Sequence, residues 1–298
     1  NRMTRIAHRA GGLVTCLFLL LSVSCASGHR EPYTGSEPAV RDLSGFEAAL
    51  RATVALSPRA SMVDAGSAED NGGGQPIWLV RIERPGSTLR ALVCAGIHGN
   101  EPAGPGFALE AVRSLCADDS LFPDTSFDVV ALLSPCAWSR DVRYDRQGID
   151  PNRDFATFDS ATARAVRALT AGLRYDVVLD HHEDPDAKGF YLYQYADRDT
   201  RPTRALIAAV RGMGFPIEQD VRMVILRTRD GLVEAPRWGL WYMRASRRLS
   251  MSNWLRLEGA AKVYTVETPT LLPFEDRLLL HRTAFDALLS AGLKGAAR

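Results

Sequence analysis

The feature that most constrains this chain is an apolar run that stops at a cluster of chemically versatile side chains. Residues 91–97 are apolar and are typical of a buried strand, and His98, Gly99, Asn100 and Glu101 follow at once. Ligands bind at the carboxyl ends of strands in open α/β sheets, so His98 and Glu101 are expected to face a site. An imidazole and a carboxylate are two of the three protein ligands of a catalytic zinc. The alternative is a helix start at which Glu101 only complements the helix dipole.

Strand patterns and helix patterns alternate along the rest of the chain. Strands are predicted over residues 77–82, 89–97, 127–133, 175–181, 190–195 and 262–267. Helices are predicted over residues 43–56, 103–116, 161–173, 201–213 and 274–293. Residues 64–75 are expected to form a loop, residues 134–157 a long connection of functional character, and residues 215–256 give no clear pattern. The predicted fold class is α/β: a single-domain α/β/α sandwich with a mainly parallel mixed sheet.

The first residues differ in composition from the rest. Basic residues precede a short apolar run at 13–21 and a stretch of small residues, which is the pattern of a secretory signal. We therefore expect a signal peptide over 1–26, a polar tether over 27–44 and a catalytic domain over 45–298. Residues 22–25 resemble a bacterial lipoprotein box, so Cys25 is either a lipid-anchor residue or lies beside an ordinary cleavage site near Ala26. The expected location is outside the cytoplasm of a bacterium, in the periplasm or as a membrane-anchored lipoprotein.

A third metal ligand is expected at the end of another predicted strand. The apolar run at 175–179 leads into Asp180, His181 and His182. Successive side chains of an extended strand point to opposite faces, so only one of the two histidines can face a shared metal. The residues alone leave both open. His281 lies in a helical pattern and is expected to be structural.

Four motifs in series resemble the zinc carboxypeptidase family, and most closely its succinylglutamate desuccinylase/aspartoacylase branch. They are His98-Gly-Asn-Glu101, Asp150-Pro-Asn152-Arg153, Asp180-x-His182 and Val-Glu267-Thr-Pro. The resemblance covers about residues 75–293 and implies a carboxypeptidase-like fold with one Zn²⁺ per chain.

The resemblance also implies a role for each matching residue. His98, Glu101 and His182 match the metal ligands; His182 is preferred, although His181 stands where the family has an apolar residue. Asp150 matches the aspartate that orients the ring of the first ligand. The remaining matches are Asn152 and Arg153 to the substrate-carboxylate pair, Arg143 to the arginine that polarises the scissile carbonyl (with Arg140 as the competing position), and Glu267 to the general base.

These roles imply hydrolysis of an amide bond next to a free carboxylate. The substrate is then a peptide, for an exported metallocarboxypeptidase, or an acyl-amino acid, for an N-acyl amino acid deacylase. Exposure to extracellular peptides favours the first. A third alternative is a non-catalytic, surface-tethered binding protein on the same fold. The net charge of +1 and the absence of a basic tract give no indication of a nucleic-acid partner, and the sequence does not define the oligomeric state.

Overall fold

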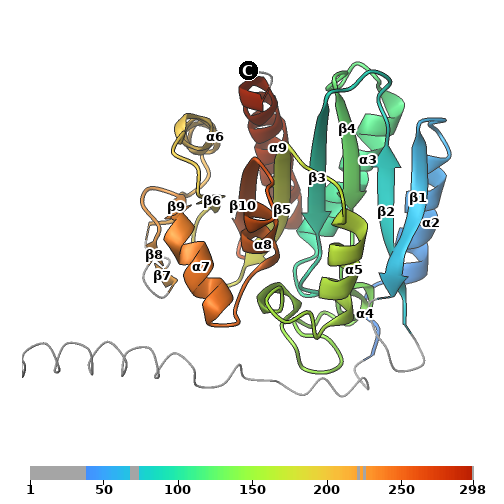
Figure 1. The fold of residues 1–298 in the computed structure, drawn as a ribbon, viewed down its shortest axis with the longest axis horizontal. Coiled ribbons are helices and arrows are strands. Elements are labelled where there is room, and N and C mark those ends of the chain that lie inside the picture. The colour runs from blue at the N-terminus through green and yellow to red at the C-terminus, as the bar shows by residue number, and fades with distance from the viewer. Residues whose placement is uncertain (1–37, 68–73, 220–221, 224–225, 297–298) are drawn as a thin grey trace, which may run out of the picture. The chain divides into compact units, whose positions relative to one another are not determined.

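The computed structural model describes residues 38–67, 74–219, 222–223 and 226–296. The predicted signal peptide, Cys25 and most of the predicted tether lie outside these ranges. The described part is built on an eight-stranded mixed sheet (Figure 1). In spatial order its strands are β1 (Ala60–Ser67), β2 (Pro76–Ile82), β4 (Thr125–Val130), β3 (Leu89–Ala95), β5 (Val177–Asp184), β10 (Lys262–Pro269), β6 (Tyr191–Tyr195) and β9 (Leu232–Ala235).

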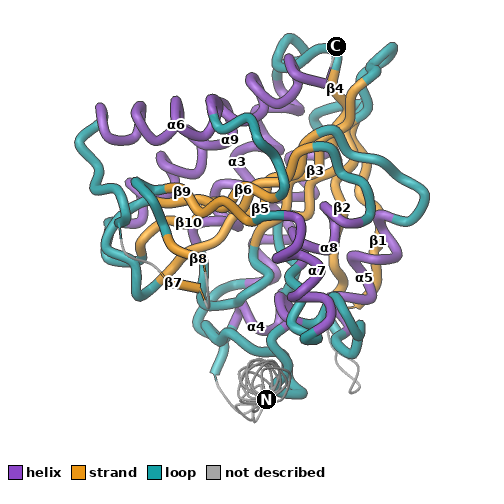
Figure 2. The backbone as a smooth tube through the Cα atoms, turned by 60° about the vertical axis from the view of Figure 1, so that its left-hand side comes forward, coloured by secondary structure: helices purple, strands orange, loops and turns teal. Residues whose placement is uncertain are grey.

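Helices cover both faces of this sheet, as Figure 2 shows. One face packs against α2 (Leu43–Val54), α3 (Ala103–Ala117), α6 (Arg201–Gly212) and α9 (Phe274–Ala296). The other face packs against α5 (Ala161–Thr170), α7 (Arg237–Ala245) and α8 (Met251–Leu257). The predicted α/β/α sandwich is therefore confirmed. None of the helices in the described ranges has the length and hydropathy of a membrane span.

The centre of the sheet is parallel, which sets where a site can form. Strands β4, β3, β5 and β10 are parallel neighbours, and β6 and β9 form a second parallel pair that is antiparallel to β10. The pairs β1–β2 and β2–β4 are antiparallel. The four parallel central strands bring their carboxyl ends to one edge, where the side chains that follow them meet.

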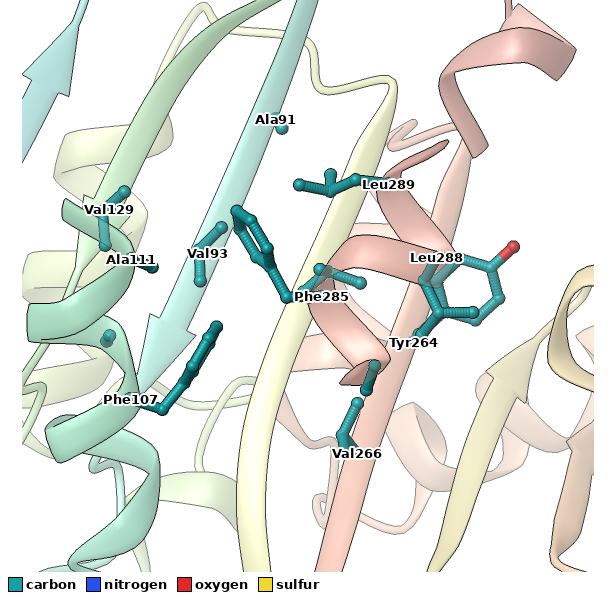
Figure 3. Close-up of a cluster of buried hydrophobic side chains, with 14 of the residues drawn as sticks. Ala91, Val93, Phe107, Ala111, Val129, Tyr264, Val266, Phe285, Leu288 and Leu289 are labelled. Atoms are coloured by element: carbon teal, nitrogen blue, oxygen red, sulfur yellow. The ribbon is translucent and has the colours of Figure 1, made fainter. Parts of the chain in front are cut away.

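Alternation along the strands divides the apolar core into two layers. Val93 packs on the α3/α9 face, whereas its neighbours Leu92 and Cys94 pack on the other face. Figure 3 shows the first layer, in which Phe107 of α3 and Phe285 of α9 lie over the sheet. Their ring centroids are 5.5 Å apart in an edge-to-face arrangement. Cys94, Cys116 and Cys136 are buried and form no disulfide among the described residues.

Two parts of the chain differ from the sequence prediction. Residues 64–67, expected in a loop, belong to the edge strand β1. Residues 215–256, which gave no clear pattern, contain β9, α7, α8 and a small hairpin of β7 (Arg222–Met223) and β8 (Leu226–Arg227). The long connection at 134–157 contains α4 (Pro135–Ser139) and the 3₁₀ helix η1 (Pro151–Arg153), and is otherwise irregular as expected.

Candidate metal centre

The turn after β3 brings His98 and Glu101 together. Gly96 has φ 64°, a left-handed conformation that glycine adopts without steric cost, and it redirects the chain beyond the end of the strand. His98 and Glu101 are each 2% exposed. The Nδ1 atom of His98 lies 2.5 Å from Oε1 of Glu101. The buried pair faces the carboxyl edge of the sheet.

His182 completes the cluster from the neighbouring strand β5. Its Nδ1 atom lies 2.8 Å from Oε2 of Glu101, so each carboxylate oxygen faces one imidazole. One nitrogen or oxygen of His98, Glu101 and His182 can be chosen such that all three lie within 4.8 Å of one another. Three atoms bound at roughly 2.1 Å to one tetrahedral zinc lie roughly 3–4 Å apart. The spacing and the ligand types therefore fit a zinc site with three protein ligands.

The outer ring nitrogen of each imidazole lies beside a carboxylate. Nε2 of His98 lies 3.2 Å from Asp150, and Nε2 of His182 lies 3.2 Å from Asp180. A carboxylate on one ring nitrogen fixes the tautomer that leaves the other nitrogen free to bind a metal. Burial would raise the pKa of Glu101, but the two histidines hold it well below its usual range. The carboxylate is therefore ionised, as a metal ligand must be.

The structure separates the two adjacent histidines of β5. His181 points to the opposite face of the sheet, where its Nδ1 lies 3.0 Å from Nδ1 of His281 on α9. Its ring lies tilted against that of Phe107, with centroids 4.6 Å apart. Burial lowers the pKa of His181 to about 3, so its ring is neutral. His182, and not His181, lies in the cluster with His98 and Glu101.

Arg143 and Asp150 lie against the first imidazole. Nη2 of Arg143 donates to Asp150 at 3.0 Å, and Nη1 lies 3.2 Å from Nδ1 of His98. Burial opposes ionisation of Asp150, but His98, Arg153 and Arg143 hold its pKa well below the usual range. The competing Arg140 instead donates to the Cys136 carbonyl at 3.3 Å and is not part of the cavity lining.

Asn152 and Arg153 occupy η1 beside His182. Both residues line the cavity. Oδ1 of Asn152 accepts a hydrogen bond from the Met251 amide at 3.0 Å, and its Nδ2 lies 3.4 Å from Nε2 of His182. Arg153 donates to the Asn152 carbonyl at 2.8 Å. The side-chain oxygen of Asn152 is thus engaged, and Nη1 of Arg153 is held by the Asn152 carbonyl at the cavity wall.

Glu267 lies beside the cluster on β10. Its backbone is in register with His182 of the parallel strand β5, so both side chains emerge at the same level of the sheet. Burial raises the pKa of the Glu267 carboxyl to about 8, with Glu101 adding to the rise and His182 opposing it. A carboxyl with this pKa can take up and release a proton near neutral pH.

A cavity of about 430 Å³ opens over these residues. Seven of the eight predicted site residues line it: His98, Glu101, Arg143, Asn152, Arg153, His182 and Glu267. The eighth, Asp150, stands behind His98. The structure therefore brings all eight together, from four separate segments of the chain.

Several residues of the cavity wall were missed by the sequence reasoning. Tyr191, Tyr193 and Tyr195 of β6 form part of the wall, and their spacing by two was a usable signal for one strand face. Asn253 near the start of α8 also lines the cavity; it is 7% exposed, and its Oδ1 has no hydrogen-bond partner among the described residues. No local pattern marks it. Of the exposed aromatic residues on α7, Trp238 and Trp241 are not part of the cavity lining.

Comparison with known proteins identifies relatives of this chain. Residues 87–224 match the family model of the succinylglutamate desuccinylase/aspartoacylase catalytic domain. Carboxypeptidase 2 of Trichophyton tonsurans is 30% identical over 114 residues, which are 37% of this chain and 21% of that relative. The chain thus spans about a fifth of the length of the curated relatives that it matches.

Solved structures agree with the sequence comparison. A Shewanella denitrificans OS217 protein described as a metallopeptidase has a TM-score of 0.70 and 25% identity, covering 84% of this chain and 90% of that one. A metallo-carboxypeptidase from Pseudomonas aeruginosa, solved with (2-guanidinoethylmercapto)succinic acid, has a TM-score of 0.60 and 18% identity, covering 83% and 68%. These matches confirm the resemblance of the chain to the zinc carboxypeptidase family, and within it to the succinylglutamate desuccinylase/aspartoacylase branch.

Proposed function

We propose that this protein is a zinc-dependent hydrolase that cleaves an amide bond next to a free carboxylate. One observation carries the proposal: His98, Glu101 and His182 converge with their binding atoms inward, while Glu267 stands in register with His182 at the same cavity. One metal ion beside one proton-accepting carboxylate is the minimum that metal-assisted hydrolysis needs.

Each residue then has a chemical task. His98, Glu101 and His182 would hold a zinc ion, which would supply Lewis acidity and make water in the cavity easier to deprotonate. Glu267 accepts a proton as water attacks the amide carbonyl, and returns it to the leaving nitrogen. Arg143 offers its guanidinium to the oxyanion that develops on that carbonyl.

The substrate carboxylate is assigned to Arg153, with Asn152 holding that arginine in place. A guanidinium pairs with a carboxylate through two parallel hydrogen bonds. The Arg153 side chain is anchored through the Asn152 carbonyl and faces the same cavity as Glu267. The Pseudomonas relative was solved with a succinic acid derivative, which itself carries carboxylates.

We favour a metallocarboxypeptidase over an N-acyl amino acid deacylase. The cavity of about 430 Å³ extends past the predicted ligands along β6, α7 and α8, which leaves room for the side chain of a C-terminal residue. The deacylase remains the second candidate, because the matching family model is that of the desuccinylase and aspartoacylase catalytic domain.

We further propose that the protein acts outside the cytoplasm, on the strength of the leader-like residues 1–26 and Cys25. Expression in a bacterium with radiolabelled palmitate would test the lipoprotein form. Palmitate label that is present in the parent and lost in Cys25→Ser supports a lipid anchor. An unlabelled protein in the soluble periplasmic fraction supports simple secretion. A protein found in the cytoplasm contradicts export.

The function is tested by metal content and turnover together. Blocked dipeptides, N-succinyl amino acids and N-acetyl amino acids would be offered to the parent protein, Glu267→Gln and the exposed control Glu258→Gln. We expect stoichiometric zinc in all three, and turnover lower by at least about 10²-fold in Glu267→Gln alone. The preferred substrate class separates peptidase from deacylase. Bound zinc without Glu267-dependent turnover of any substrate would instead support a binding protein.

A further inference from the structure

Arg41, just before α2, contacts the segment that carries two of the predicted metal ligands. Its Nη1 atom donates to the Gly99 carbonyl at 3.0 Å and to the Trp138 carbonyl at 2.6 Å. Its Nη2 atom donates to Asp141 at 2.5 Å. Gly99 follows His98 directly, and Trp138 belongs to α4. One guanidinium therefore joins the ligand turn at 98–101 to the end of α4; we call this set of contacts the Arg41 bridge.

The ligand turn and α4 are in close backbone contact at this point. A Cβ atom added at Gly99 would lie 2.1 Å from the carbonyl carbon of Ala137 and 2.4 Å from the Trp138 amide. Only glycine allows this approach, so the position of His98 depends directly on where α4 lies. The Arg41 bridge lies where the ligand turn and α4 are in contact.

The last carbonyls of α4 accept hydrogen bonds from residues 40–41, the segment that contains Arg41. The carbonyl groups at a helix end lack partners within the helix and carry partial negative charge. The amides of Val40 and Arg41 both donate to the Ser139 carbonyl, at 2.7 and 3.1 Å. The guanidinium of Arg41 also lies over the Trp138 ring, 5.5 Å from its centroid. Residues 40–41 thus satisfy the end of α4 with backbone and side chain together.

The same region leads to Arg143. The chain leaves α4 through Asp141, whose φ is 62°, and Asp141 forms the ion pair with Arg41. Two residues later, Arg143 reaches Asp150 and lies 3.2 Å from His98. The Arg41 bridge therefore contacts both segments that carry residues of the centre here: the turn with His98 and Glu101, and the turn before Arg143.

We propose that Arg41 is a positioning residue of the metal centre, acting through the Gly99 and Trp138 carbonyls. This inference rests on the zinc site of the proposed function, but not on any particular substrate. Removal of groups that orient metal ligands typically costs about 10- to 100-fold in metal affinity. Lysine has a compact charge and cannot reproduce the planar fork of arginine, so it is expected to restore the site only in part.

The test measures zinc affinity by chelator competition and amide hydrogen exchange of residues 98–101, in the full chain. Arg41→Gln is expected to bind zinc about tenfold more weakly and to exchange faster at this turn, with Arg41→Lys intermediate. Arg51→Gln is the matched control, because Arg51 also pairs with a carboxylate and lies over a tryptophan, Trp78, at 4.4 Å. It should behave as the parent.

Parent-like zinc affinity and exchange in Arg41→Gln would overturn the inference. If Arg41→Gln does not fold, Arg41→Lys and Asp141→Asn decide, since each removes only part of the bridge and must still weaken zinc binding. A parent protein that binds zinc but hydrolyses nothing refutes the proposed function and leaves this inference intact, because neither readout uses turnover.

Discussion

At the scale of single residues, Glu267 is a carboxyl group whose surroundings favour its neutral form. Burial raises its pKa to about 8 from an ordinary 4.5. Between these values the unfolded chain has released the proton while the folded chain retains it, so the free energy of unfolding falls as pH rises. This contribution is complete below about pH 4.5 and is lost as pH rises through about 8.

We therefore expect zinc-free parent protein to lose stability relative to Glu267→Gln as the pH is raised. From about pH 5 to about pH 9 the difference in free energy of unfolding between the two proteins should change by at least about 1 kcal/mol, the equivalent of roughly one pKa unit. Urea unfolding of both proteins across this range measures it, with Glu258→Gln as an exposed control. Parallel stability profiles for parent and Glu267→Gln would show that the folded carboxyl has an ordinary pKa.

Asn253 gives a second prediction at this scale, concerning substrate preference. Its buried Oδ1 has no partner among the described residues and belongs to the cavity wall. A buried acceptor left unpaired costs binding energy, so a leaving residue with an N–H or O–H donor should be preferred. In Asn253→Leu the ratio of kcat/KM for a C-terminal glutamine over a C-terminal leucine should fall about tenfold. An unchanged ratio at normal zinc content would place the specificity elsewhere.

At the scale of elements, two adjacent histidines of strand β5 have different roles because their side chains lie on opposite faces of the sheet. His182 lies in the cluster with His98 and Glu101, and His181 packs against His281 on the other face. His182→Leu should therefore lose zinc affinity by more than about 10²-fold, because it removes a ligand. His181→Leu should bind zinc within a few-fold of the parent but unfold about 1–3 kcal/mol more easily, because it leaves the buried Nδ1 of His281 without its partner. Chelator competition and urea unfolding separate the two effects, and a reversed result would contradict the assigned face.

The elements that the sequence predicts well are those with a strong burial pattern. The buried strands β3, β5 and β10 and the helices α3 and α9 were found within a few residues, and with them the ends that carry His98, His182 and Glu267. The edge strand β1 was not predicted. Its side chains are at least partly exposed on both faces, which removes the alternation. The helix α7 was missed because only Leu240 of its nine residues is buried.

At the scale of the whole molecule, the site joins segments that are far apart in sequence. Residues from the turn after β3, the 134–157 connection, β5 and β10 meet at one cavity. The resemblance to a family could indicate these residues, because each motif is local. It could not indicate Asn253 or Arg41, because their roles depend on packing between distant segments and leave no local pattern.

The contacts of Arg41 finally bear on where the chain can be shortened. A protein that starts at residue 38 keeps Arg41 and should bind zinc like the full chain. One that starts at residue 42 keeps Asp42, which caps α2, but should bind zinc about tenfold more weakly. Equal affinities in chelator competition would contradict this. Truncation from the N-terminus should therefore be tolerated up to a point upstream of residue 40, and removal of only a few residues more should yield a folded protein with weakened zinc binding.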